Sequence, residues 1–295
     1  MRFTKMEALG NDFVVLDGIR QRLGLTPETI RGLADRRHGV GCDQVLIAEP
    51  PGQPAADVRY RIYNADGTEV EHCGNGVRCL ARFVVEAGLV RPGRLRIETD
   101  GRITETETLP DGRVTVDMGA PELEPARIPF RAPARQQCYT LATSRGEQAV
   151  GAVSMGNPHA VLAVEDVDTA PVATLGPELE AHPSFPNRAN VGFMEIVDRG
   201  RIRLRVYERG VGETPACGTG ACAAVVAGRL WDRLDPVVAV ELAGGSLVVE
   251  WVGPERSVWL TGAGRTVFHG DIAWPLPTAP QTTPGAPASS KDETV

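Results

Sequence analysis

Lysine is nearly absent from this 295-residue chain. Of its 31 Lys and Arg residues, only Lys5 and Lys291 are lysines. An enzyme that uses pyridoxal phosphate holds the cofactor as a Schiff base on an internal lysine. Lys5 lies beside the N-terminus, and Lys291 belongs to a terminal segment rich in Pro, Thr, Ala and Ser. The sequence therefore argues against pyridoxal-phosphate chemistry.

Long apolar runs and clusters of basic residues are also missing. No stretch approaches the roughly 18 apolar residues that a membrane-spanning helix needs, and residues 1–5 lead into mixed sequence without a signal-peptide core. The net charge is −7 and the arginines are dispersed, which argues against a surface for nucleic acid. We therefore expect a cytoplasmic protein that binds neither membranes nor nucleic acid.

The six cysteines lack the Cys-x-x-Cys spacing of common metal and redox motifs. Cys73 and Cys79 are six residues apart, and Cys217 and Cys222 are five apart. A zinc site is therefore poorly supported, and we expect no metal. A chain of this size without a secretion signal should keep its thiols reduced. Cys79 and Cys222 lie in apolar helical segments, where we expect them to be packing residues.

One segment of the chain occurs twice. Val58–Gly76 aligns with Ile202–Gly220 at an offset of 144, and seven of the nineteen pairs are identical: Arg59/Arg203, Arg61/Arg205, Tyr63/Tyr207, Glu69/Glu213, Cys73/Cys217, Gly74/Gly218 and Gly76/Gly220. About one identity would be expected by chance. A second repeat, at an offset of 146, pairs Gly10-Asn11 with Gly156-Asn157. The chain therefore predicts two domains of related fold.

Strand and helix patterns surround the repeated cysteines in the same order. Residues 58–63 and 202–207 alternate apolar and charged side chains, as half-buried strands do. The segments 77–87 and 221–227 are mostly apolar, which predicts buried helices. A further helix is expected from Thr26 to about Arg37, and more strands at 13–16, 45–48, 95–99, 114–118, 160–164, 192–197, 237–242, 247–251 and 258–261. The pattern predicts an α+β protein rich in antiparallel strands, with a disordered tail from 276 to 295.

Cys73 and Cys217 are the candidates for chemistry. A thiol at a helix N-terminus lies beside unpaired N–H groups and the positive end of the helix dipole, so we expect a lowered pKa at both cysteines. The glycines that follow allow close approach of a ligand, and the same N–H groups can hold a carboxylate. If the two domains face each other, one thiolate can remove a proton from a carbon while the opposite thiol protonates its other face. Such an inversion requires no cofactor.

Two other interpretations remain open for these cysteines. Cysteine at a helix start is often a small buried apolar residue, although duplication of the whole surrounding motif favours a reactive site. A thiol redox protein would instead cycle Cys73 and Cys217 through a disulfide. The symmetric contexts argue against this, because a redox pair usually has unequal attacking and resolving sulfurs.

Seven short motifs are distributed along both halves: Gly10-Asn11-Asp12-Phe13, Gly41-Cys42-Asp43-Gln44, Asn64-Ala65-Asp66-Gly67-Thr68, Cys73-Gly74-Asn75-Gly76, Met155-Gly156-Asn157-Pro158-His159, Tyr207-Glu208-Arg209-Gly210 and Ala216-Cys217-Gly218-Thr219-Gly220. With these motifs the chain resembles the diaminopimelate epimerase family from about Met1 to Trp274. The resemblance implies two pseudo-symmetric domains, each a sheet wrapped around a central helix, with the active site between them. It implies domains at 1–117 and 118–263, a final strand at about 264–275 that returns to the first domain, and a homodimer.

The resemblance also implies the reaction, the interconversion of LL- and meso-diaminopimelate on the way to lysine and cell-wall peptide, with Cys73 and Cys217 as acid and base. It places His159 and Glu208 beside the reacting centre, where they either bind the reacting ammonium group or tune the activity of the thiols. It also implies that substrate is bound by Asn11, Gln44, Asn64, Gly74, Asn75, Asn157, Asn190, Glu208, Arg209, Gly218 and Thr219. Amide side chains suit the distal amino-acid group of this substrate, and an arginine can clamp its carboxylate bidentately.

Related proline racemase-like enzymes also use opposed cysteines, but Arg209 and the asparagines favour a longer, doubly charged substrate. The chain departs from the family pattern at Thr68, where Ser is usual, and at Glu71-His72. His72 is expected to be an exposed bystander.

Overall fold

The computed structural model describes residues 1–70, 74–99 and 102–273. Within these residues the chain forms four α-helices and eighteen β-strands, so the predicted α+β class is confirmed. Cys73 and His72 lie outside the described residues, as does the predicted disordered tail.

The strands of the first half pair side by side in a mixed sheet. Across the sheet the order is β18 (Arg265–Asp271), β1 (Arg2–Ala8), β2 (Asn11–Asp17), β3 (Gln44–Glu49), β4 (Val58–Asn64), β6 (Arg94–Thr99), β7 (Arg102–Thr108) and β8 (Val114–Asp117). The pairs β2–β3 and β4–β6 are parallel and the others antiparallel. The short β5 (Glu69–Val70) also pairs with β4.

The second half repeats this sheet strand for strand. Its order is β9 (Tyr139–Thr143), β10 (Gly146–Ser154), β11 (Pro158–Val164), β12 (Asn190–Asp198), β13 (Arg201–Glu208), β15 (Val237–Leu242), β16 (Gly245–Glu250) and β17 (Trp259–Gly262), with β14 (Gly212–Thr214) on β13. The pairs β11–β12 and β13–β15 are parallel, at the positions that correspond to the two parallel pairs of the first half. The pseudo-symmetry predicted from the repeated motifs is therefore confirmed.

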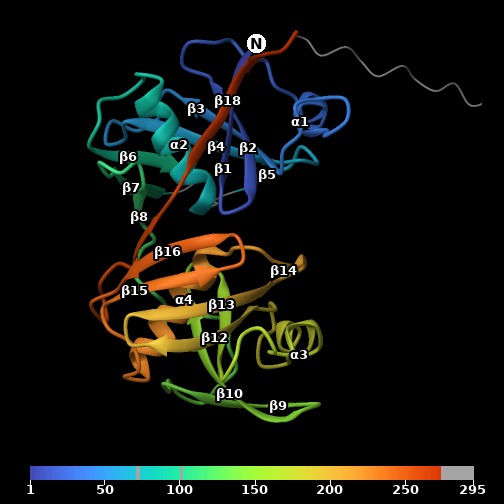
Figure 1. Ribbon diagram of the computed structural model, residues 1–295, viewed down its shortest axis with the longest axis vertical. Helices are drawn as coiled ribbons and strands as arrows, with labels where there is room; N and C mark the ends of the chain where they lie inside the picture. The colour runs from blue at the N-terminus through green and yellow to red at the C-terminus, as the bar shows by residue number, and fades with distance from the viewer. Residues whose placement is uncertain (71–73, 100–101, 274–295) are drawn as a thin grey trace, which may run out of the picture.

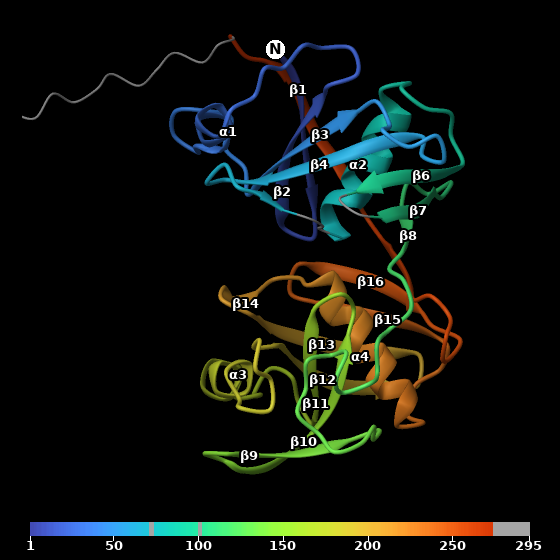
Figure 2. The ribbon, with the colours of Figure 1, turned by 180° about the vertical axis from the view of Figure 1, so that it is seen from behind.

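Each sheet surrounds a helix that begins at the repeated motif. These helices are α2 (Gly74–Glu86) and α4 (Gly218–Leu230), and Figures 1 and 2 show each of them enclosed by the strands of its own half. Residues 220–228 of α4 are all buried, because small apolar side chains let strands approach the helix from every side. The prediction of buried central helices is confirmed. Cys79 and Cys222 are completely buried in them, as expected of packing residues.

Two smaller helices cover the outside of the sheets, α1 (Pro27–Ala34) and α3 (Val172–Glu180). Thr26 caps α1, and its hydroxyl accepts the N–H of Thr29. The prediction that this helix reaches Arg37 is wrong. The Asp35 carboxylate accepts the N–H groups of Arg37 and His38, and this turn ends the helix at Ala34.

The two halves contact each other through their central helices α2 and α4, and also through a strand pair and a pair of turns. Strand β8 pairs antiparallel with β17, and the hydroxyls of Thr115 and Thr261 lie 2.8 Å apart in this pairing. The β1–β2 turn of the first half also touches the β15–β16 turn of the second, where a Cβ on Gly244 would lie 2.2 Å from the carbonyl oxygen of Leu9. Glycine at 244 thus allows these two turns to approach each other closely. We propose 1–117 and 118–263 as the limits of the two domains, with the chain returning to the first domain at 264–275.

Candidate active site

A cleft of about 1020 Å³ lies between the two halves. Both halves contribute predicted site residues to its lining, namely Asn11, Gln44, Asn64, Gly74 and Asn75 from the first half and Asn157, Glu208, Arg209, Cys217, Gly218 and Thr219 from the second. The beginnings of both central helices are therefore on the wall of one cleft. Cys73 itself lies outside the described residues, but it is bonded to Gly74, which lines the cleft.

The first-half wall presents three amide side chains at the ends of neighbouring strands. Gln44 begins β3 and stands opposite Asn64 at the end of β4, and its Nε2 donates to Asn64 Oδ1 at 2.9 Å. Asn11 begins β2, and its Nδ2 donates to Asp43 Oδ2 at 2.9 Å. Donors and acceptors for a polar substrate are thus gathered at this edge of the sheet.

Charged residues behind Asn11 hold this edge in place. Arg36 donates to both carboxylate oxygens of Asp12, at 2.9 and 2.7 Å, and to Asp43 at 2.8 Å, while Lys5 Nζ donates to Asp12 at 2.6 Å. Burial raises the pKa of Asp12, but the hydrogen bonds from Arg36 and Lys5 outweigh it and hold that pKa well below its usual range. Both carboxylates are therefore fixed acceptors in a network that ends on Asn11.

Cys217 is the N-cap residue of α4 and is 6% exposed. Burial raises the pKa of its thiol far above the usual range, and the nearby Glu208 carboxylate raises it further. The Thr219 hydroxyl, 3.5 Å from the sulfur, and the Gly220 N–H act in the opposite direction. The prediction of a lowered pKa is therefore wrong for Cys217, because desolvation outweighs the helix N-terminus. Cys217 carries its proton and is suited to donate it.

Glu208 is held beside Cys217 by a residue that the sequence patterns did not identify. Thr214, on β14, donates its hydroxyl to Glu208 Oε1 at 2.5 Å. The hairpin β13–β14 brings the two residues together by pairing Glu208 with Gly212. Thr214 follows the repeated Glu213, and that position could have drawn attention to it.

His159 lies behind the cleft wall and not on it, since it is 1% exposed. Its Nε2 lies 3.1 Å from Asn157 Oδ1, Asn157 Nδ2 donates to the Thr219 hydroxyl at 3.4 Å, and Thr219 in turn contacts Cys217. Because Asn157 uses its NH₂ group toward Thr219, the neutral imidazole must donate to its oxygen. A chain of hydrogen bonds thus runs from His159 to Cys217, and we propose that His159 acts on the reacting centre through it.

Asn190 is also buried behind the wall, at 3% exposure. Its Oδ1 accepts the backbone N–H of Arg209 at 2.9 Å, and its Nδ2 donates to the carbonyl of Pro158 at 3.4 Å. The Arg209 guanidinium donates to the carbonyl of Asn187 at 3.0 Å and lines the cleft. Asn190 therefore supports the strand that presents Arg209.

Burial, together with the charge of Arg209, lowers the pKa of His159 from 6.5 to about 3. The folded protein therefore binds fewer protons here than the unfolded chain, so stability from this group is present above about pH 6.5 and is lost as the pH falls toward 3. We expect the wild type to lose about 2 kcal/mol between pH 6.5 and pH 5 through His159 alone. Urea unfolding measures the free energy of unfolding at both pH values, and for His159→Gln this free energy should fall by about 2 kcal/mol less than for the wild type. His38→Gln, at an exposed position, should keep the wild-type dependence; equal slopes for both variants would contradict the argument.

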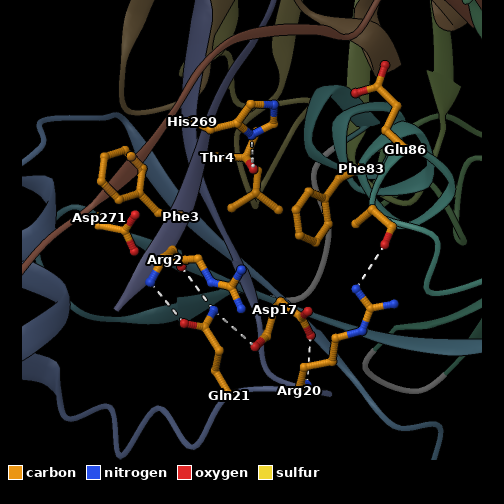
Figure 3. A pocket seen from close by; sticks show the side chains of 13 residues that line it. Arg2, Phe3, Thr4, Asp17, Arg20, Gln21, Phe83, Glu86, His269 and Asp271 are labelled. Atoms are coloured by element: carbon orange, nitrogen blue, oxygen red, sulfur yellow. Dashed lines mark hydrogen bonds between the residues drawn. The ribbon is translucent and has the colours of Figure 1, made fainter.

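A smaller hollow of about 410 Å³ lies in the first half between β1, β18 and the end of α2 (Figure 3). Thr4 Oγ1 lies 3.0 Å from His269 Nδ1 there, and Arg20 donates to the carbonyls of Ala87 and Gly88 at 2.9 Å each. Its polar side chains thus bond to the hollow's own walls, and none of the predicted site residues lines it.

In the described part of the chain, no three His, Cys, Asp or Glu side chains gather in a way that could hold a metal ion. Among the described helices, none has the length and apolar character needed to cross a membrane.

Similarity to known proteins extends over both halves of the chain. Residues 3–124 and 151–267 match the family model described as diaminopimelate epimerase. A diaminopimelate epimerase of Halorhodospira halophila is 76% identical over 287 residues, which cover 97% of this chain and 99% of the relative. One of Alkalilimnicola ehrlichii is 59% identical over 274 residues, covering 92% and 98%.

Solved structures share the architecture at low identity. A hydroxyproline epimerase from Agrobacterium vitis, with bound trans-4-hydroxy-L-proline, superposes with a TM-score of 0.63 at 19% identity and covers 92% of this chain and 91% of its own. A phenazine biosynthesis protein of the PhzF family from Bacillus anthracis gives 0.66 at 18% identity, covering 92% and 99%. At these identities the likeness shows the fold alone.

Proposed function

The chain belongs to the diaminopimelate epimerase family, and from this premise we propose that it interconverts LL- and meso-diaminopimelate by a two-base reaction that uses no cofactor. The chain is accordingly an isomerase. One observation carries the proposal. The starts of two pseudo-symmetric helices, Gly74-Asn75 and Cys217-Gly218, line the same cleft, so a substrate between them meets both halves at once.

The proposed reaction moves one proton off the substrate and another onto it. The Cys73 thiolate removes the α-proton from one face, and the electron pair that is left spreads into the adjacent carboxylate. The protonated Cys217 then donates its proton to the opposite face, which inverts the centre. Cys73 is left as the thiol and Cys217 as the thiolate, so the two protonation states are exchanged. The reverse reaction starts from the exchanged state. Because the working pair needs one thiolate and one thiol, its apparent pKa values belong to the pair.

The helix starts are suited to hold the reacting carboxylate. Backbone N–H groups at Gly74 and Asn75 and at Gly218 and Thr219 lie at the positive ends of α2 and α4, where negative charge is stabilised as the carbanion forms. The raised pKa of Cys217 supports its assignment as the thiol of the pair. We assign Cys73 the thiolate role by the family match.

The distal end of the substrate is assigned to polar side chains of both halves. We propose that Asn11, Gln44 and Asn64 from the first half and Asn157 and Arg209 from the second bind its amino-acid group, and that Asn190 contributes to this set from behind the cleft wall. Within this set, Asn190 acts through Arg209, whose backbone N–H it accepts. Such a set fits a carboxylate and an ammonium group better than it fits an apolar ring.

Glu208 and His159 receive different roles. Glu208 lines the cleft beside Cys217, so we propose that it binds the reacting ammonium group and keeps the thiol protonated. His159 is buried and neutral, so we propose that it acts on Cys217 through Asn157 and Thr219.

We also propose that the protein acts in the cytoplasm as a homodimer, in lysine and peptidoglycan precursor synthesis. Val267 and Phe268, which are 56% and 47% exposed, give the edge strand β18 an apolar surface that a second copy could cover.

The deciding experiment incubates purified protein with LL-diaminopimelate in deuterated water, without added cofactor. We expect deuterium at the α-carbon and formation of the meso isomer, because each return of a hydrogen takes it from a solvent-exchanged thiol. Chromatographic separation of the isomers and mass spectrometry measure both. Deuterium exchange with proline but not with diaminopimelate would favour the proline racemase class. A loss of two titratable thiols that a reductant reverses, without exchange on either substrate, would favour the redox alternative.

A further inference from the structure

Arg78 is a fully buried guanidinium directly behind the start of α2. Its Nη2 donates to Asn75 Oδ1 at 2.8 Å, its Nη1 to the carbonyl of Gly74 at 3.4 Å, and its Nε to the carbonyl of Ala263 at 3.2 Å. One side chain therefore joins a cleft-lining amide, the first turn of the helix and the segment on which the chain returns to the first half.

The chemistry of the guanidinium fixes the orientation of Asn75. Arginine has only N–H donors, so the oxygen of the Asn75 amide must face Arg78, and its NH₂ group must point to the other side. Asn75 is 6% exposed and lines the cleft. We infer that Arg78 is a positioning residue, which holds Asn75 so that its NH₂ group is presented to the substrate carboxylate. The inference rests on the proposed function for the identity of that carboxylate.

Two glycines leave room for Arg78 at the returning segment. A Cβ on Gly262 would lie 3.0 Å from Arg78 Nε, and a Cβ on Gly264 would lie 3.2 Å from the backbone C and O of Arg78. Gly262 ends β17, and Arg265 begins β18. The position of Asn75 is therefore fixed relative to the connection between the halves as well as to its own helix.

The repeat shows that this arrangement belongs to one half. At the offset of 144, Cys222 stands in place of Arg78, and Thr219 in place of Asn75. Thr219 receives its hydrogen bond from Asn157 instead. Both halves thus hold the side chain at their helix start by a hydrogen bond, but the partners differ. Arg78 occurs in the half that has Asn75, whose oxygen requires a donor.

The test compares Arg78→Met and Arg78→Lys with Arg82→Met in steady-state epimerisation of diaminopimelate. Arg82 is a matched control, because it lies one turn farther along α2 and donates to the carbonyl of Gly264 at 3.0 Å without lining the cleft. We expect Arg78→Met to lower kcat/KM by about 10- to 100-fold, since small misplacement of a binding group is costly. Arg78→Lys keeps the charge but loses the planar fork, so its loss should be smaller. Arg82→Met should stay within about two-fold.

A double-mutant cycle with Asn75→Ala separates positioning from general stability. If Arg78 acts through Asn75, the double variant should match Asn75→Ala alone, and calorimetric binding of diaminopimelate should show the same non-additivity. Additive losses, or Arg78 variants indistinguishable from Arg82→Met, would overturn the inference. Should Arg78→Met not fold, the cycle with Arg78→Lys decides in the same way. A wild type that does not act on diaminopimelate would instead refute the proposed function.

Discussion

Replacement of Cys217 with Ala is expected to slow epimerisation of diaminopimelate by about 10³-fold or more, from either isomer. A single remaining thiolate can return a proton only to the face from which it removed one, so inversion requires the second sulfur. The structure strengthens this expectation at Cys217, because burial and Glu208 keep its proton in place for donation. Initial rates of meso formation from the LL isomer, and of the reverse reaction, measure the effect. The same loss is expected for Cys73→Ala.

Cys222→Ala provides the matched control for this prediction. Cys222 lies on the same helix and is completely buried, and burial raises its pKa to about 12, so it is a neutral packing residue. The variant should keep near-normal kcat and lose about 1 kcal/mol of stability from the small cavity. Full epimerisation by Cys217→Ala, measured beside this control, would refute the two-base mechanism.

The largest effect on stability is expected at Lys5. This side chain is 9% exposed and donates to the carboxylate of Asp12 and to the carbonyl of Gly41. Lys5→Met removes both hydrogen bonds and leaves the buried carbonyl of Gly41 and the partly buried carboxylate of Asp12 without that donor, which should cost about 3 kcal/mol. Arg36 retains its bonds to Asp12, so the fold should survive.

Urea unfolding at neutral pH measures the change at Lys5. Arg2→Met is the control on the same strand, where an exposed side chain should change the free energy of unfolding by about 0.5 kcal/mol or less. If the two variants unfolded at the same urea concentration, the network behind Asn11 would contribute nothing to stability.

The architecture could be predicted where the two halves have identical residues at corresponding positions. The repeat predicted two related domains, and the apolar character of residues 221–227 predicted a helix enclosed by strands. Helix α3 was not predicted, because Gly176 and Pro177 lower helix propensity there. Its formation depends on packing, since Gly176 lies so close to the Tyr207 ring that a Cβ would be 2.7 Å from Tyr207 Cγ. Such a contact between distant segments leaves no local signal.

The sequence motifs named residues that line the cleft, but not how deeply each of them is buried. Motifs identified Cys217 and Glu208, but the pKa of Cys217 depends on how far the sulfur is removed from water, which residue order does not reveal. For the same reason the sequence did not reveal that His159 lies behind the cleft wall, from which it reaches Cys217 through Asn157 and Thr219. The repeat did not predict a role for Arg78, because the corresponding residue in the second half is Cys222.

The two halves differ in where one strand lies along the chain. In the first half β18 takes the place that β9 takes in the second, although β18 comes last along the chain. Met1 and Ile272 are also adjacent, with Met1 N donating to Ile272 O at 2.7 Å and Ile272 N to Met1 O at 2.9 Å. A circular permutant joined between these two residues and opened before β18 would read as two consecutive copies of one nine-stranded unit.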